Sequence, residues 1–202
     1  MTLSRILLWR HGQTEHNASG HWQGHLDSPL TERGREQARA ATPALLAYEP
    51  NQVVASDLRR ATDTAKILVE ASGLPLRLDK RLRETDIGDW QGLTSAQVDA
   101  GYPGGIKAWQ ADPTWSPPGG ESRVEVATRA HDLVNELDEE HDGTVLLCAH
   151  GGLITALTAQ LLTMPVSIWP QLGGLSNCHW AVLGRRPGGD GRWRLLTYNA
   201  GA

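Results

Sequence analysis

The feature that most constrains this chain is a pair of apolar runs of strand length, each followed closely by His-Gly. The first run covers residues 6–9 and leads to His11, and the second covers residues 145–149 and leads to His150. Continuous apolar runs of this length are typical of strands buried on both faces of a parallel sheet. Because ligands bind beyond the carboxyl ends of such strands, we expect both imidazoles at one site, where Gly12 allows a ligand close to the backbone.

The rest of the chain alternates helical and strand patterns without internal repeats. Helices are expected over residues 31–48, 57–72, 122–141 and 151–162, and strands over residues 53–55, 76–78, 175–183 and 192–198. Ser56 is expected to cap the second of these helices. The alternation predicts an α/β fold, a three-layer α/β/α sandwich with a mostly parallel central sheet and one antiparallel edge strand. We expect a single domain over residues 1–202, with residues 85–122 as a lid-like insertion. This insertion should contain a short helix that ends at Gly101 and be loop-rich from residue 102 to 120.

Size, charge and cysteine content restrict the possible partners. The 202 residues suit one domain with a sizeable core, and the net charge of −4 gives no general attraction to nucleic acid or to an anionic membrane. The sequence has neither an apolar stretch long enough to span a bilayer nor a signal-peptide pattern. We therefore expect a cytoplasmic protein with a small-molecule partner. Cys148 and Cys178 are too few for a disulfide framework or a zinc site, and we expect inert core thiols.

Residues that could bind and transfer a phosphoryl group gather at the predicted strand ends and first helical turns. They are Arg10, His11, Asn17, Gln23, Arg59, Arg60, Glu84 and His150. Guanidinium groups match the oxygens of a phosphate, and at least one of Arg59 and Arg60 should face an anion, because a cation in a first helical turn opposes the helix dipole. A neutral imidazole can attack phosphorus. A partly desolvated carboxyl group such as Glu84 can protonate the departing oxygen.

Other phosphate-binding and hydrolytic motifs are missing from the sequence. It contains no Gly-x-x-x-x-Gly-Lys loop, no Gly-x-Gly-x-x-Gly and no Gly-x-Ser-x-Gly. At the spacing where a cysteine phosphatase has arginine, Cys148 is followed by Ile154 and Cys178 by Gly184. Nucleotide binding of the familiar kinds and cysteine or serine nucleophiles are thus unsupported.

Four segments in order resemble the motifs of the histidine phosphatase superfamily, also called phosphoglycerate mutase-like. They are residues 10–17, 56–61, 82–84 and 149–151. The resemblance covers nearly the whole chain and implies a metal-independent phosphatase without an organic cofactor. It implies that His11 is the phosphorylated nucleophile and that Glu84 is the proton donor. The rest of the implied phosphate pocket is Arg10, Arg60 and His150. Further substrate contacts are implied for Asn17, Gln23, Gly24 and Gly151.

The substrate class follows from the same resemblance. The Gly12-Gln13-Thr14 sequence differs from the Gly-Glu-Ser of cofactor-dependent phosphoglycerate mutases, and residues 83–92, 119–123 and 150–154 are similar to glucosyl-3-phosphoglycerate phosphatases. This implies hydrolysis of glucosyl-3-phosphoglycerate or a related sugar or glycerate phosphate. A phosphoglycerate mutase, a broad-specificity phosphatase and a catalytically silent binding module are the alternatives, and a homodimer is the default assembly.

Two roles in the insertion are open from the sequence. The tryptophans at positions 90, 109 and 115 could stack on a sugar or could be core residues. Glu121 could face the substrate or could simply be an acidic residue at the start of a helix.

Overall fold

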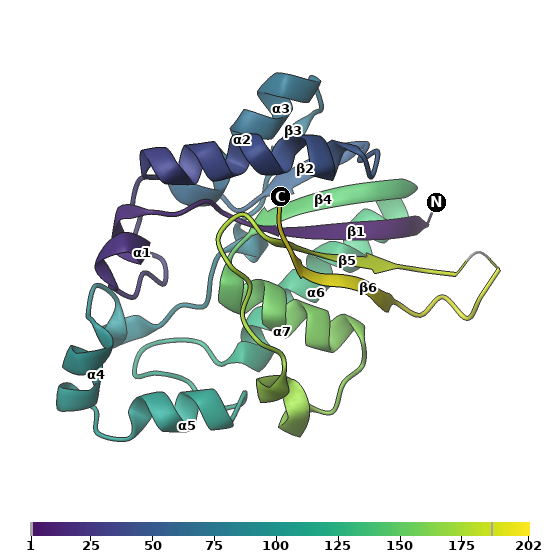
Figure 1. The fold of residues 1–202 in the computed structure, drawn as a ribbon. Coiled ribbons are helices and arrows are strands. Elements are labelled where there is room, and N and C mark those ends of the chain that lie inside the picture. Colours follow the sequence, from purple (N-terminus) through teal and green to yellow (C-terminus); the bar gives the residue numbers. More distant parts are fainter. Residues whose placement is uncertain (1, 187) are drawn as a thin grey trace.

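The central feature of the fold is a six-stranded sheet, which the computed structural model describes together with the rest of residues 2–186 and 188–202 (Figure 1). Its strands are β1 (Leu3–Arg10), β2 (Gln52–Ala55), β3 (Leu76–Leu78), β4 (Gly143–Ala149), β5 (Trp180–Gly184) and β6 (Arg194–Ala200), in the order β3-β2-β4-β1-β5-β6. The pairs β3-β2, β2-β4 and β4-β1 are parallel, and β1-β5 and β5-β6 are antiparallel. The prediction of a mostly parallel sheet with antiparallel pairing at one edge is confirmed.

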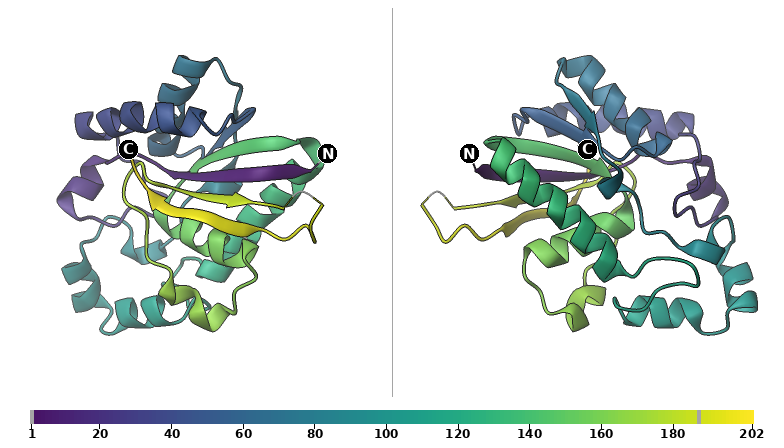
Figure 2. Two further views of the ribbon diagram at one scale, coloured as in Figure 1. Left: turned by 45° about the vertical axis from the view of Figure 1, so that its right-hand side comes forward. Right: turned by 180° about the vertical axis from the view of Figure 1, so that it is seen from behind.

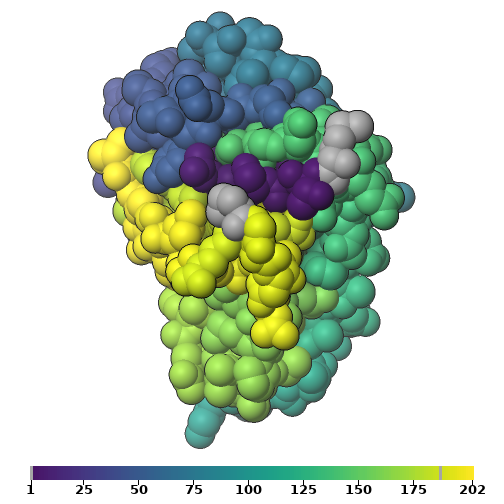
Figure 3. All heavy atoms as spheres, turned by 90° about the vertical axis from the view of Figure 1, so that its right-hand side faces the viewer, coloured from purple at the N-terminus to yellow at the C-terminus, as the bar shows by residue number. Residues whose placement is uncertain are grey.

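The register of β1 and β4 brings their two ends to the same place. Arg10 lies opposite Ala149, so His11 and His150 leave adjacent strands at the same edge of the sheet. Figure 3 looks onto the opposite end, where purple N-terminal residues lie between the green residues of β4 and the yellow C-terminal residues. The two predicted strand ends therefore meet as expected.

Helices cover both faces of the sheet, which gives the predicted three layers (Figure 2). Helices α2 (Glu32–Leu46) and α3 (Arg59–Ser72) pack on one face, and α6 (Arg123–Glu140) and α7 (Gly151–Leu161) pack on the other. Alternate residues of β1 enter the two cores: Leu8 packs towards α6 and α7, and Trp9 packs towards α2 and α3. The shorter elements are α1 (Glu15–Ser19), α4 (Ser95–Gly101), α5 (Gly105–Ala111), η1 (Lys80–Leu82), η2 (Gly88–Trp90) and η3 (Val166–Gln171).

Residues 85–122 form a lobe with an apolar cluster of its own. We call this the aromatic cluster; its buried members are Ile87, Trp90 and Val98, and around them pack Trp22, Leu93, Tyr102, Ile106, Trp109 and Trp115. Figure 1 shows α4 and α5 outside the two helical layers. Residues 102–120 were expected to be loop-rich, and the structure has within them a seven-residue helix, α5, that was not predicted. Its packing against the ring of Trp90 stabilises a segment that is too short to be recognised by its pattern.

Two further details differ from the sequence-based expectation. Helix α3 begins at Arg59, because the backbone of Leu58 is extended, so Ser56 does not cap it. The strand predicted from residue 175 begins at Trp180, and Cys178 lies before it with a positive φ of 59°. Among the described residues, no helix has the length and apolar character needed to cross a membrane.

Candidate active site

His11 lies directly after β1 and lines a cavity of about 190 Å³. The ring is almost completely buried, and its Nδ1 lies 2.7 Å from the carbonyl oxygen of Gly12. A carbonyl oxygen can only accept, so Nδ1 carries the proton and Nε2 keeps its lone pair. Burial, together with the positive charges of Arg60 and Arg10, moves the pKa of His11 well below its ordinary value. The ring is therefore a neutral imidazole with one available nitrogen.

His150 follows β4, and the centre of its ring lies 5.1 Å from that of His11. Arg60 donates through Nε to Nδ1 of His150 at 3.1 Å, so Nε2 bears the proton and donates to Oγ of Ser56 at 2.9 Å. Burial and the charge of Arg60 move the pKa of His150 well below its ordinary value. The structure brings the two predicted histidines together and places His150 against Arg60, whose guanidinium it orients.

Arg60 supplies one of the two buried positive charges. Its terminal nitrogens donate to the carbonyl oxygens of Leu26 at 2.8 Å and Gly24 at 2.7 Å, and each has a second N–H left for a ligand. Burial lowers the pKa of Arg60 to about 10, so the side chain is still cationic at neutral pH. Arg59 instead forms an exposed ion pair with Asp63 at 3.3 Å. Of the two alternatives, Arg60 is thus the one that faces the cavity.

Arg10 supplies the second positive charge. It donates from Nη1 to the carbonyl oxygen of Leu175, and its Nε is buried without a partner among the described residues. Burial lowers the pKa of Arg10, and attraction to Glu84 acts in the opposite direction. An unpaired buried donor of this kind is costly unless a ligand satisfies it.

Asn17 and Gln23 are oriented so that their amide NH₂ groups remain for a ligand. Oδ1 of Asn17 accepts from the backbone N–H of Thr14 at 3.2 Å and from Asn177 at 3.1 Å. Oε1 of Gln23 accepts from the hydroxyl of Thr14 at 3.1 Å. Both side chains line the cavity, and their remaining donors suit an anion there.

Glu84 is held by the first turn of α7. Its carboxylate accepts from the backbone N–H groups of Thr85 at 2.9 Å, Gly152 at 3.0 Å and Leu153 at 3.0 Å. The N-terminus of a helix and its free N–H groups stabilise negative charge. Glu84 is partly buried, as expected, and its carboxylate is surrounded by N–H donors.

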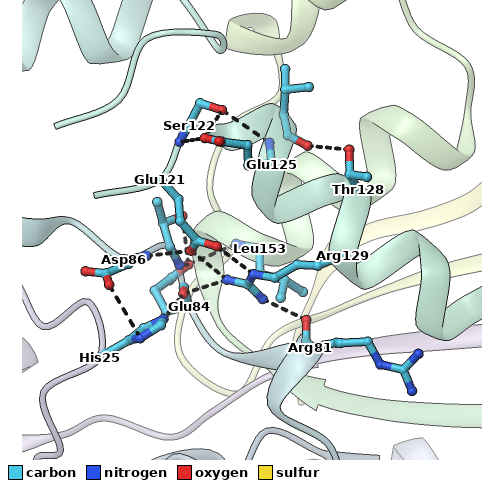
Figure 4. A network of polar contacts seen from close by, with 12 residues as sticks. His25, Arg81, Glu84, Asp86, Glu121, Ser122, Glu125, Thr128, Arg129 and Leu153 are labelled. Atoms are coloured by element: carbon cyan, nitrogen blue, oxygen red, sulfur yellow. Dashed lines mark hydrogen bonds and ion pairs between the residues drawn. The ribbon is translucent and has the colours of Figure 1, made fainter. Parts of the chain in front are cut away.

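A network of polar contacts that supports the backbone of Glu84 was not predicted (Figure 4). Arg129 of α6 donates to the carbonyl oxygens of Glu84 at 2.9 Å and Arg81 at 2.7 Å, and it pairs with Glu121 at 2.9 Å. Burial would raise the pKa of Glu121, but the hydrogen bonds from Arg129 hold it below its ordinary value. Glu121 directly precedes the N-cap residue of α6, binds Arg129 and the backbone N–H of Asp86, and does not line the cavity.

Two glycines near the site are required by close contacts within the protein. A Cβ atom on Gly12 would lie 2.4 Å from the carbonyl oxygen of Gly34 in α2, and one on Gly152 would lie 2.7 Å from Oε1 of Glu84. Gly12 was expected to make room for a ligand. The structure gives another reason for a glycine at this position, because the loop after β1 packs directly on the backbone of α2.

The cavity unites most of the predicted residues and adds some that were not predicted. Predicted lining residues are Arg10, His11, Asn17, Gln23, Gly24, Arg60 and Glu84. Trp109, one of the three tryptophans considered for sugar stacking, also lines the cavity, and the added residues are His21, Trp22, Thr85, Ile87 and Gly152. His150 and Gly151 lie next to these residues but not on the lining. Trp109 lines the cavity, whereas Trp90 is fully buried in the aromatic cluster. The spacing of apolar residues in the sequence could not have told which of these tryptophans is exposed to the cavity.

The site carries no evident metal-binding group. Within residues 2–186 and 188–202, no three His, Cys, Asp or Glu side chains are grouped so that they could hold a metal ion. Cys148 and Cys178 are free and buried, and burial raises the pKa of Cys178 to about 12. Neither thiol is thus a ready nucleophile.

Comparison with known proteins agrees with this geometry. The profile of the histidine phosphatase superfamily (branch 1) matches residues 6–201. The chain is 51% identical to a glucosyl-3-phosphoglycerate phosphatase of Mycobacterium tuberculosis (strain ATCC 25618 / H37Rv), over 100% of this chain and 97% of that one. It is 49% identical to the protein of the same name from Mycolicibacterium vanbaalenii, with the same coverage. A solved structure of mycobacterial glucosyl-3-phosphoglycerate phosphatase with VO3 has a TM-score of 0.90 at 51% identity, covering 98% of this chain and 99% of that one.

Proposed function

This chain belongs to the histidine phosphatase superfamily, and from that membership we propose that it hydrolyses the phosphate monoester of glucosyl-3-phosphoglycerate. The superfamily match and the full-length relatives make it a phosphatase rather than a phosphoglycerate mutase. The observation that carries the proposal is the neutral ring of His11 beside the cationic Arg10 and Arg60, in a cavity shared with Glu84.

The first half of the proposed reaction transfers the phosphoryl group to His11. The guanidiniums of Arg10 and Arg60 and the amides of Asn17 and Gln23 bind the phosphate oxygens. Nε2 of His11 attacks phosphorus in line while the bond from phosphorus to the ester oxygen breaks. The fixed positive charges stabilise the transition state.

Proton transfer in the proposed reaction is assigned to Glu84. Its carboxyl group donates a proton to the departing ester oxygen, and the resulting carboxylate is stabilised by the N-terminal N–H groups of α7. Glu84 then takes a proton from the water that attacks the phosphohistidine. Phosphate leaves, and the neutral ring of His11 is restored.

The lobe of residues 85–122 acts in this proposal as the lid over the single domain. Trp109 from the lobe and Trp22 from the loop after α1 both line the cavity, and their ring centres lie 5.3 Å apart. Aromatic rings of this kind stack on the apolar faces of sugars. We assign the glucosyl group to the part of the cavity lined by Trp22.

The location and assembly of the protein are also proposals. We propose a cytoplasmic enzyme that acts on a small phosphorylated metabolite, without nucleic acid or membrane partners, in agreement with its net charge of −4. We propose a homodimer through the edge strand β6, where Leu196 is 53% exposed. Light scattering on the purified protein measures the assembly, and a monomeric mass would contradict it.

Substrate ranking tests the proposed function. Phosphate release should be most efficient with glucosyl-3-phosphoglycerate in a panel that includes sugar phosphates and 3-phosphoglycerate, and His11→Ala should abolish it. Equal efficiencies across the panel would indicate a broad-specificity phosphatase. Isomerisation of 3-phosphoglycerate that requires a bisphosphate primer would indicate a mutase, and activity that survives His11→Ala would exclude His11 as the nucleophile.

A further inference from the structure

Arg123 is a cation beside the cavity that has no anionic partner. It is the first residue of α6, and its side chain makes no ion pair or hydrogen bond with the rest of residues 2–186 and 188–202. Two other arginines near Glu84 do have anionic partners, Arg83 with Asp57 and Arg129 with Glu121. The charge of Arg123 is thus still available to a ligand.

The position of Arg123 is electrostatically unfavourable in the protein alone. The side chain is half-buried, and burial lowers the pKa of Arg123, while attraction to Glu84 opposes this. It also lies in the first turn of an 18-residue helix, where the helix dipole repels a cation. An acidic residue suits this turn, and Glu125 in it completes a capping box with Ser122 rather than pairing with Arg123.

The guanidinium lies over a ring that forms the cavity wall. Its central carbon is 4.3 Å from the centre of the Trp109 ring, and Trp109 lines the cavity together with Glu84. Stacking occupies the face of the guanidinium, so the N–H groups at its edge keep the planar fork that matches a carboxylate. The charge lies on the Trp109 side of the cavity, whereas Arg10 and Arg60 surround His11.

On the basis of the proposed function, we propose that Arg123 is a specificity residue that binds the carboxylate of the glycerate part of the substrate. A substrate with two separate anionic groups would then meet two separate cationic sites. Arg10 and Arg60 hold the phosphate, and Arg123 holds the carboxylate by charge-assisted hydrogen bonds. Phosphate esters of similar size that lack a carboxylate would gain nothing from Arg123.

A matched pair of ligands isolates this contribution. In glycerol 3-phosphate a hydroxymethyl group replaces the carboxylate of 3-phosphoglycerate. Calorimetric titration of the His11→Ala protein, which removes turnover, should show tighter binding of 3-phosphoglycerate. Adding Arg123→Gln should weaken 3-phosphoglycerate binding about tenfold or more and glycerol 3-phosphate binding less than about twofold.

Controls separate this role from a structural one. Arg123→Lys keeps the charge but loses the planar fork, so its affinity for 3-phosphoglycerate should lie between those of the proteins with Arg123 and with Arg123→Gln. Arg39→Gln, at an exposed ion pair with Glu32, should change the affinity for neither ligand. The proposal would be overturned if Arg123→Gln weakened the binding of both ligands equally. It would also be overturned if the His11→Ala protein with Arg123 intact showed no preference for 3-phosphoglycerate. Because binding is measured without turnover, the result is independent of whether glucosyl-3-phosphoglycerate is the preferred substrate.

Discussion

The state of His11 is set by one hydrogen bond and by burial. Donation from Nδ1 to the carbonyl of Gly12 leaves Nε2 free, and the lowered pKa keeps the ring neutral. His150 is neutral for the same reason, but both of its nitrogens are already used, by Arg60 and Ser56. Two histidines with similar burial therefore have different chemical capacities.

The neutral histidines make the stability of the protein dependent on pH. An unfolded chain protonates its histidines below a pH of about 6.5, whereas these two resist protonation in the fold. Stability should thus be complete above that pH and fall below it, by about 1.4 kcal/mol per pH unit for each histidine. Denaturant unfolding measured between pH 7 and 5 should show a smaller slope for His150→Gln. His131→Gln, on the exposed side of α6, is the control, and an unchanged slope in His150→Gln would contradict the argument.

Replacing Glu84 tests its assignment as the acid. Glu84→Gln should lower kcat for an alkyl phosphate by about 10² to 10⁴-fold, because the departing alkoxide is left without a proton. The loss should be much smaller for p-nitrophenyl phosphate, whose leaving group departs without one. Rapid-quench measurement of the first turnover with both substrates compares the two cases. An equal loss with both would mean that Glu84 only shapes the site.

At the scale of elements, the loop after β1 depends on its contact with α2. The backbones meet so closely at Gly12 and Gly34 that a Cβ on Gly12 would overlap a carbonyl oxygen at 2.4 Å. Gly12→Ala should destabilise the fold by about 1 to 3 kcal/mol and lower activity, because His11 must shift with the loop. Gly101→Ala has open space around it and should be harmless. Urea unfolding and phosphate release compare the two, and a fully stable, active Gly12→Ala protein would refute the contact's importance.

The elements also show which parts of the site can be predicted from sequence. Strands β1 and β4 have continuous apolar runs, and the parallel-sheet rule then brings His11 and His150 to one edge. Arg129 gives no such signal, because it reaches the backbone of Glu84 across 45 positions of sequence. Helix α5 was not predicted because a helix of seven residues is stabilised by tertiary packing and not by the helix propensity of its residues.

At the scale of the whole molecule, the lobe of residues 85–122 has a core separate from those of the sheet. Trp90 is fully buried at its centre, with Trp22, Trp109 and Trp115 packed against it. The three sequence candidates for sugar stacking therefore divide between core and wall. Four of the eight tryptophans in this chain therefore pack together in the core of the lobe.

Removing Trp90 should separate binding of the larger substrate from the chemistry. Trp90→Ala should lower the free energy of unfolding by about 3 kcal/mol or more, and it should reduce kcat/KM for glucosyl-3-phosphoglycerate more than for p-nitrophenyl phosphate. Leu161→Ala deletes a buried side chain in the α6–α7 layer and should affect both substrates alike. Thermal melts and initial rates are the measurements, and parallel losses in Trp90→Ala would argue against a role of the lobe in substrate choice.

The strand order also governs when, during synthesis, this chain could first act. β4 lies between β1 and β2, so these two early strands have no partner in common until the late strand β4 pairs with both of them. A ribosome-bound fragment that ends before residue 143 therefore contains His11 but lacks both His150 and the helix start that holds Glu84. The nascent polypeptide therefore lacks a complete candidate site until residues 143–153, about three quarters of the way along the chain, have emerged.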